Sequence, residues 1–106
     1  PDADIFALAA KGSTVCIQAF FIRGGQNWGH RSFFPAHTSN VEIDEVFSSF
    51  LMQFYDQMPP PKLVLLDREL PDAELLAEAL STQADYRVSV SKPAGAGRGA
   101  GSDRDL

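Results

Sequence analysis

The first third of the chain alternates hydrophobic runs with short turns. Residues 5–10 form a short apolar run, and residues 14–22 and 27–34 are rich in the β-branched and aromatic side chains typical of strands. Residues 11–13 separate the first two runs, and a pair of glycines lies between the second and the third. Because such short connections join antiparallel neighbours, this pattern predicts a three-stranded meander.

The middle of the chain changes to a helical period. Residues 43–58 place apolar side chains at i, i+3, i+4 and i+7, which predicts an amphipathic helix stopped by three consecutive prolines. The fully apolar residues 63–66 predict a buried strand, residues 72–82 a second helix and residues 87–91 a last strand. Strands that alternate with helices favour parallel pairing through right-handed crossovers.

The resulting order is β-β-β-α-β-α-β, which is the layout of a ribonuclease H-like α/β fold. We expect a mixed five-stranded sheet with helices packed on its faces, formed by residues 1–92 as one domain. Residues 93–106 are dominated by Ala, Gly, Ser and charged residues without apolar periodicity. This composition predicts a flexible Gly/Ala-rich linker.

The net charge of −5 is unevenly distributed and changes the functional expectations. No acidic side chain occurs between Ile5 and Val41, whereas residues 42–85 hold ten acids against Lys62 and Arg68. Phosphate binding needs clustered positive charge, so the chain as a whole is a poor non-specific DNA binder. The acidic block is a candidate surface for a basic protein partner or a solvated helix face.

Compartment and context also follow from the composition. No apolar run approaches the roughly 20 residues of a membrane helix, and no signal peptide is recognisable. The single Cys16 excludes an internal disulfide, fits a reducing cytoplasm and is expected as a small buried hydrophobe. A start at Pro1 without Met suggests a piece of a longer protein.

The predicted hairpin of residues 20–35 is the main candidate site. Arg23, Trp28, His30 and Arg31 gather around its tip, where they are suited to contact phosphates and to stack on a base. A contact with a protein partner is the other functional interpretation of these side chains. The structural alternative is that Trp28 covers the edge of the core while the polar residues keep the hairpin soluble.

A divalent-metal site is the second candidate. Ribonuclease H-type nucleases hold two metal ions with carboxylates from the first strand, the first helix and the end of the fourth strand. The corresponding residues here are Asp4, Asp44 or Glu45, and Asp67. Asp67 is placed best, whereas Asp4 is expected to precede the first strand, and helix capping accounts for the acids at the start of the first helix. We therefore expect ordinary surface carboxylates and no metal site.

The hairpin carries a resemblance to a known family. The informative runs are Asp4 to Ala9, Val15 to Gln18, Phe21-Ile22-Arg23-Gly24-Gly25, Gly29-His30-Arg31-Ser32-Phe33-Phe34-Pro35, Phe50-Leu51-Met52-Gln53-Phe54-Tyr55, Leu63 to Leu66 and Leu75 to Leu80. Across residues 4–92 the chain resembles the UvrC subunits of bacterial UvrABC excinucleases.

The resemblance implies a role in nucleotide excision repair of DNA damage, a pathway linked to the SOS response. UvrC subunits make the two incisions that flank a lesion after UvrA and UvrB have located it, and they use divalent metal, Mg or Mn. The chain resembles the segment between the UvrB-binding motif and the catalytic endonuclease core. The Phe-Asp-Ile-Ser-His type of run of that core is absent, so no catalytic residue and no cofactor carries over.

The leading hypothesis is thus a non-catalytic, monomeric, cytoplasmic module that helps to position dual incision, with UvrB and damaged DNA as partners of the parent protein. One alternative is a protein–protein adaptor whose acidic helices dock UvrB or a neighbouring UvrC domain. Another is a cryptic divalent-metal nuclease that uses Asp4, Glu45 and Asp67.

Overall fold

The computed structural model describes residues 1–37 and 40–94. The predicted linker therefore lies outside the described residues, except for Pro93 and Ala94. None of the helices in the described part has the length and apolar character needed to cross a membrane.

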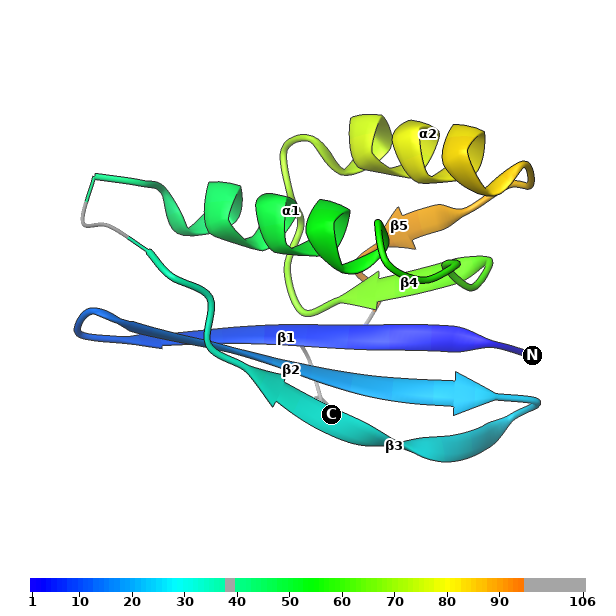
Figure 1. Cartoon of the computed structure of the whole chain (residues 1–106), viewed down its shortest axis with the longest axis horizontal. Helices are drawn as coiled ribbons and strands as arrows, with labels where there is room; N and C mark the ends of the chain where they lie inside the picture. The colour runs from blue at the N-terminus through cyan, green and yellow to red at the C-terminus, as the bar shows by residue number, and fades with distance from the viewer. Residues whose placement is uncertain (38–39, 95–106) are drawn as a thin grey trace.

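The chain forms a mixed five-stranded sheet and two helices (Figure 1). The elements are β1 Ala3–Lys11, β2 Thr14–Arg23, β3 Gln26–Phe33, α1 Ile43–Phe54, β4 Leu63–Leu66, α2 Ala73–Ala84 and β5 Ser89–Ser91. The sheet order is β3-β2-β1-β4-β5, with β1, β2 and β3 antiparallel and with β4 parallel to both β1 and β5. The predicted element order and mixed sheet are confirmed.

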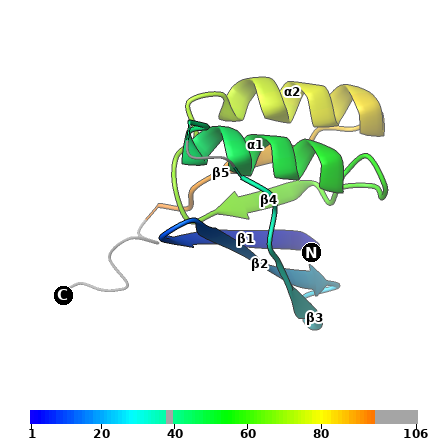
Figure 2. The same cartoon turned by 60° about the vertical axis from the view of Figure 1, so that its left-hand side comes forward.

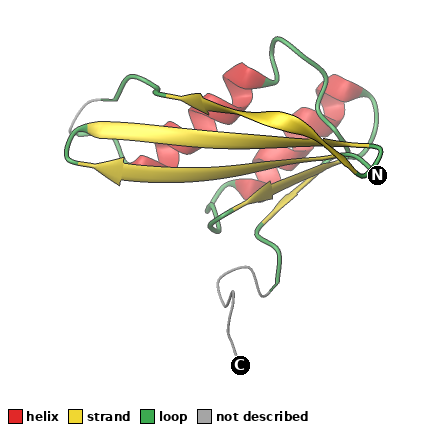
Figure 3. Cartoon of the chain, turned by 90° about the horizontal axis from the view of Figure 1, so that it is seen from below, coloured by secondary structure: helices red, strands yellow, loops and turns green. Residues whose placement is uncertain are grey.

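Both helices lie on the same face of the sheet, as Figures 1 and 2 show. The expectation that helices would cover both faces is wrong. From β3 the chain crosses β2 and β1 to reach β4 through α1, and it then continues in the same direction to β5 through α2. Successive right-handed crossovers in one direction place their helices on one side. Figure 3, seen from below, shows the strands in front of the helices, so no described element covers the other face.

The core lies between the sheet and the helices and is strongly aromatic. The ring of Phe6 from β1 meets the rings of Phe50, Phe54 and Tyr55 edge to face, with centroids 5.7–6.1 Å apart. Phe33 from β3 packs against Phe50 at 5.0 Å. Edge-to-face pairs add about 0.5–1.5 kcal/mol to the burial of their area. The aromatic stripe predicted for the first helix is therefore core, and it fixes α1 across β1, β2 and β3.

The element ends differ from the sequence pattern in two places that matter for the site. The first strand begins at Ala3, because Ala3 pairs with Ile22 and Asp4 with Phe21. Asp4 therefore lies within β1 and is fully buried, which corrects the expectation that it precedes the strand. Helix α1 ends at Phe54 although its apolar period continues to Met58, and the next residue, Tyr55, turns its ring into the core.

Candidate functional site

The β2–β3 turn is a tight two-glycine connection tied to the start of the chain. Gly24 and Gly25 have φ values of 61° and 77°, which glycine adopts freely and which match the twist of a type I′ hairpin. The Gly24 amide donates to the Asp2 carboxylate at 2.8 Å, and the Gly25 amide donates to the Pro1 carbonyl at 2.9 Å. The residues that precede β1 thus hold the hairpin tip.

Arg23, at the end of β2, points back into the molecule. Its Nη1 donates to Asp4 Oδ1 at 2.8 Å and to the carbonyl oxygen of Ile22 at 2.8 Å. Its side chain is 25% exposed, whereas the Asp4 carboxylate is completely buried. The hydrogen bond to Asp4 is the main reason why the pKa of Arg23 is raised above its usual value. Arg23 is therefore an internal counter-ion, and its guanidinium is only partly available to a ligand.

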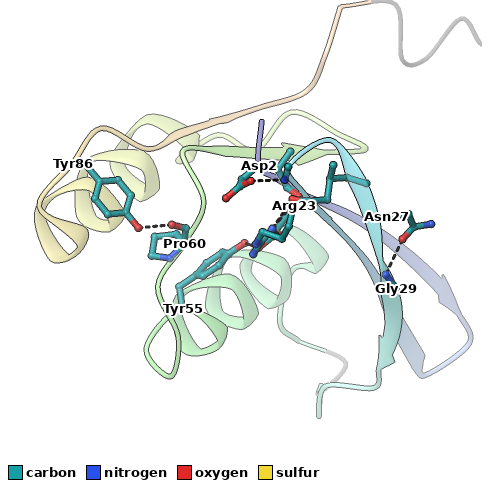
Figure 4. Close-up of polar contacts among 11 residues, drawn as sticks. Asp2, Arg23, Asn27, Gly29, Tyr55, Pro60 and Tyr86 are labelled. Atoms are coloured by element: carbon teal, nitrogen blue, oxygen red, sulfur yellow. Dashed lines mark hydrogen bonds and ion pairs between the residues drawn. The ribbon is translucent and has the colours of Figure 1, made fainter.

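Tyr55 occupies the other oxygen of the same carboxylate. Its hydroxyl, at the C-terminal end of α1, donates to Asp4 Oδ2 at 2.5 Å. Burial raises the pKa of Tyr55 far above its usual value, and the negative charge of Asp4 raises it further. Figure 4 shows Arg23 and Tyr55 converging from β2 and from the end of α1. The phenol stays protonated and serves as a donor.

These three residues form a cluster, here called the Asp4 cluster, that joins β1, β2 and α1. A buried carboxylate is costly unless both of its oxygens are satisfied. Here one oxygen receives a charged donor and the other a phenol. The arrangement makes Asp4 a structural residue that connects the hairpin to the helix layer.

Trp28 lies on the surface and is 72% exposed. The alternative in which it covers the edge of the core is therefore wrong. The β2–β3 register shifts between Phe20 and Ile22, opposite Trp28, and the neighbouring Gly29 has a φ of 111°. Irregularities of this kind re-aim side chains at sheet edges. The Gly29 amide is held by the Asn27 side chain at 2.7 Å (Figure 4).

His30 and Arg31 are both exposed but do not form one basic patch. His30 pairs with Phe20 and stacks on its ring at 5.4 Å, on the sheet face that no described element covers. Arg31 pairs with the buried Ala19 and lies over the Phe33 ring at 4.7 Å, on the helix side. Successive strand residues face opposite sides of a sheet, so these two side chains diverge. Their predicted contact with nucleic acid or a partner stays a prediction.

The three candidate metal ligands lie in separate surroundings. Val64 in β4 pairs with Asp4, and Asp67 lies three residues after Val64. The Cα atoms of Asp4 and Asp67 are therefore roughly 10 Å apart. Asp67 accepts a hydrogen bond from the Leu8 amide and forms an ion pair with Arg68 at 3.2 Å. Glu45 is exposed in the first turn of α1. Within residues 1–37 and 40–94, no group of three His, Cys, Asp or Glu side chains is arranged to hold a metal ion.

Two residues that hold this part of the molecule together, Tyr55 and Arg68, could not be recognised from the sequence. Tyr55 is part of an apolar helical stripe, and nothing in its spacing indicates a buried partner for its hydroxyl. Arg68 donates to the Leu8 carbonyl at 2.8 Å, which fastens the segment after β4 to β1. Cys16 corrects another expectation, because it is half-buried on the uncovered face of the sheet.

The fold and the comparisons with known proteins agree. The sheet order and the crossovers define a ribonuclease H-like α/β domain. Residues 2–99 match the family model described as the UvrC Ribonuclease H-like domain, and the chain belongs to this family.

Named relatives support the same assignment. The chain is 64% identical over 92 residues to the UvrABC system protein C of Sphingopyxis alaskensis, covering 87% of this chain and 14% of that protein. It is 59% identical over 92 residues to the protein of the same name from Novosphingobium aromaticivorans, with the same coverage. The chain thus spans about a seventh of the length of these relatives.

The chain is also similar to a solved structure from Bacteroides thetaiotaomicron that is described as having an actin-like ATPase fold and unknown function. The matched region covers 85% of this chain and 32% of the chain in that structure. Its TM-score is 0.45 and its sequence identity is 16%.

Proposed function

We propose that the chain is a non-catalytic ribonuclease H-like module of a UvrC-type excinuclease subunit and helps to position dual incision around a DNA lesion. The observation that carries the proposal is the Asp4 cluster. Both oxygens of the first-strand carboxylate are bound inside the protein, by Arg23 and Tyr55. A two-metal nuclease needs such a carboxylate free to hold an ion.

A second feature supports the non-catalytic role. Continued past Phe6 and Leu66, the β1–β4 register places Ala7 beside Asp67, and the amide of the next residue, Leu8, donates a hydrogen bond to that carboxylate. An apolar side chain therefore stands where a metal ligand from the first strand would have to meet Asp67. In this proposal the module needs no cofactor of its own, and the divalent metal used for incision belongs to other parts of the parent protein.

The proposed contact surface is the edge strand β3. Trp28 offers an exposed aromatic ring, and Arg31 offers an exposed charge fixed over Phe33. His30 extends this surface on the other face of the strand. Arg23 serves the contact indirectly, because its hydrogen bond to Asp4 fixes the end of β2 next to the hairpin turn. Damaged DNA is the proposed target, with UvrB as the protein partner of the parent subunit in the cytoplasm.

The test is the binding of the whole chain to a fluorescein-labelled duplex that contains an unpaired bubble. Trp28→Ala removes the stacking ring, which is worth about 1–3 kcal/mol where a base stacks. Arg31→Ala removes a phosphate contact and lowers the salt slope of binding by about one. Lys11→Ala is the matched control, because Lys11 is exposed at the β1–β2 turn, away from β3. Equal effects of Arg31→Ala and Lys11→Ala would overturn the hairpin role.

The acidic helix layer favours a second candidate function, an adaptor that docks UvrB or a neighbouring UvrC domain. Asp44 and Glu45 lie in the first turn of α1, and Glu74 lies in the first turn of α2. Chemical-shift mapping with UvrB and, separately, with the bubble duplex distinguishes the two roles. UvrB-induced shifts confined to α1 and α2 favour the adaptor, and DNA-induced shifts along β3 favour the hairpin contact.

A further inference from the structure

The two helices lie side by side over the sheet (Figures 1 and 2). Side chains of both helices line a groove between them. This α1–α2 groove has a volume of about 420 Å³. Its walls come from α1 and from the N-terminal part of α2. The lining residues are Ser48, Ser49, Met52, Gln53, Asp72, Leu75, Leu76 and Ala79.

Large apolar side chains at the groove are left in water. Leu75 is 70% exposed and Met52 is 37% exposed, whereas the adjacent Leu76 is buried in the core. The core requires Leu76 and Leu80, but it does not require an apolar residue at position 75. Exposed apolar side chains that line one concave site are typical of contact surfaces.

The groove continues into an acidic hollow at the N-terminal ends of the two helices. This hollow has a volume of about 390 Å³ and shares Ser48 and Asp72 with the groove. Its other lining residues are Glu42, Asp44, Glu45 and Pro71. Residues 42–85 contain only two basic side chains. One of them, Arg68, donates hydrogen bonds to the Asp67 carboxylate and to the Leu8 carbonyl. The hollow is thus lined by four carboxylates, whose charge the N-terminal ends of the two helices offset only in part, and it adjoins the apolar residues of the groove.

We propose that the α1–α2 groove binds a cationic amphipathic helix of a protein partner. Its apolar side chains would contact Leu75 and Met52, and its Lys or Arg side chains would lie over the acidic hollow. A third helix packs into the groove between two neighbouring helices, with the usual distance of roughly 8–10 Å between helix axes. The groove walls are helical and present no unpaired strand edge, so an extended peptide has no backbone partner there. The negative charge excludes nucleic acid.

This inference goes beyond the proposed positioning role and names a partner chemistry for the adaptor role. The groove is formed by the two helices, whereas the proposed DNA contact lies on the edge strand β3. The variants at β3 and those at the groove are different, so failure of one proposal is distinguishable from failure of the other.

The test uses the whole chain and a synthetic Leu/Lys peptide whose leucines recur at i, i+3, i+4 and i+7. Two control peptides are a scrambled sequence of the same composition and a Leu/Glu peptide with the same leucine positions. Binding is followed by fluorescence anisotropy and by chemical-shift mapping. We expect the Leu/Lys peptide to bind with shifts confined to α1 and α2, and each control peptide to bind at least about tenfold more weakly.

Two pairs of variants assign the contact to the groove. Leu75→Ser is expected to weaken peptide binding about tenfold, whereas Leu63→Thr, a 38% exposed position on the uncovered face of the sheet, leaves it unchanged. Glu45→Gln is expected to weaken binding about threefold at low salt, whereas Asp56→Asn, beyond the other end of α1, has little effect. Far-ultraviolet circular dichroism checks that each variant folds.

Three results would overturn the proposal. The first is peptide-induced shifts spread over the whole surface, which indicates non-specific attraction to an acidic protein. The second is unchanged affinity in a folded Leu75→Ser variant. The third is concentration-dependent self-association in light scattering that Leu75→Ser abolishes, because the groove would then bind a second copy of the chain.

Discussion

Asp4 is a carboxylate whose two oxygens are both occupied inside the protein. Arg23 binds one oxygen at 2.8 Å and Tyr55 binds the other at 2.5 Å. From the sequence alone, Asp4 was a possible metal ligand and Arg23 a possible DNA contact. Once the two side chains pair, neither is free for the role that its residue type suggested. The pairing depends on the β1–β2 register, which residue spacing does not encode.

The first prediction concerns the partner of this buried charge. Arg23→Ala is expected to lower the free energy of unfolding by about 2–4 kcal/mol, because it leaves the Asp4 carboxylate buried with one donor fewer. Arg31→Ala, at an exposed arginine on the next strand, removes only the contact with the Phe33 ring and is expected to change it by less than about 1 kcal/mol. Urea unfolding measures both variants. Similar losses in the two variants would contradict a structural role for Arg23.

At the scale of elements, the Asp4 cluster decides how α1 ends. The apolar period of the sequence continues past Phe54, but Tyr55 leaves the helix and reaches the carboxylate in β1. Helix α1 is therefore anchored at its C-terminal end to the strand that it crosses. The hydrogen bond between Arg23 and Asp4 also fixes the position of the hairpin, because Arg23 immediately precedes the Gly24-Gly25 turn.

This anchor predicts a dependence of stability on pH. At neutral pH, Tyr55→Phe is expected to lower the free energy of unfolding by about 2 kcal/mol, because it removes a hydrogen bond to a charged acceptor. The pKa of Tyr55 is raised in the folded chain, whereas an unfolded tyrosine ionises near about pH 10. Above that pH the unfolded state alone loses the proton, so the wild type loses about 1.4 kcal/mol of stability per pH unit through this group.

The measurement is urea unfolding of wild type and Tyr55→Phe at a series of alkaline pH values. Phenylalanine has no proton to lose, so the stability difference between the two proteins should narrow above about pH 10. A difference that stays constant across this range would contradict the raised pKa and the buried hydrogen bond.

At the scale of the whole molecule, hydrophobic periodicity was sufficient to predict the architecture. The run at 63–66 and the prolines after α1 identified the strands and crossovers that make the mixed sheet. The placement of both helices on one face was not predicted, because local periodicity shows that a helix has an apolar side but not which face of the sheet receives it. The order of the strands in the sheet and the handedness of the crossovers decide which face it is.

The candidate site was less predictable than the fold. The hairpin was located correctly, but the sequence left open whether Trp28 is exposed, and it suggested one basic cluster. In the structure Arg23 turns inward, and His30 and Arg31 lie on opposite faces of β3. Side-chain direction depends on strand register and on the irregularity beside Gly29, which arise from tertiary pairing.

The central claim, that the first-strand carboxylate is structural and the module non-catalytic, is tested most directly by titrating Mn²⁺ into the chain and following paramagnetic broadening of its amide signals. We expect no selective broadening at Asp4, and at most weak, non-converging effects at exposed acids such as Glu45. Selective broadening of Asp4 together with Asp67 at metal concentrations comparable to the protein would contradict the account, because it requires a metal ion bound between two carboxylates that are held apart in this structure.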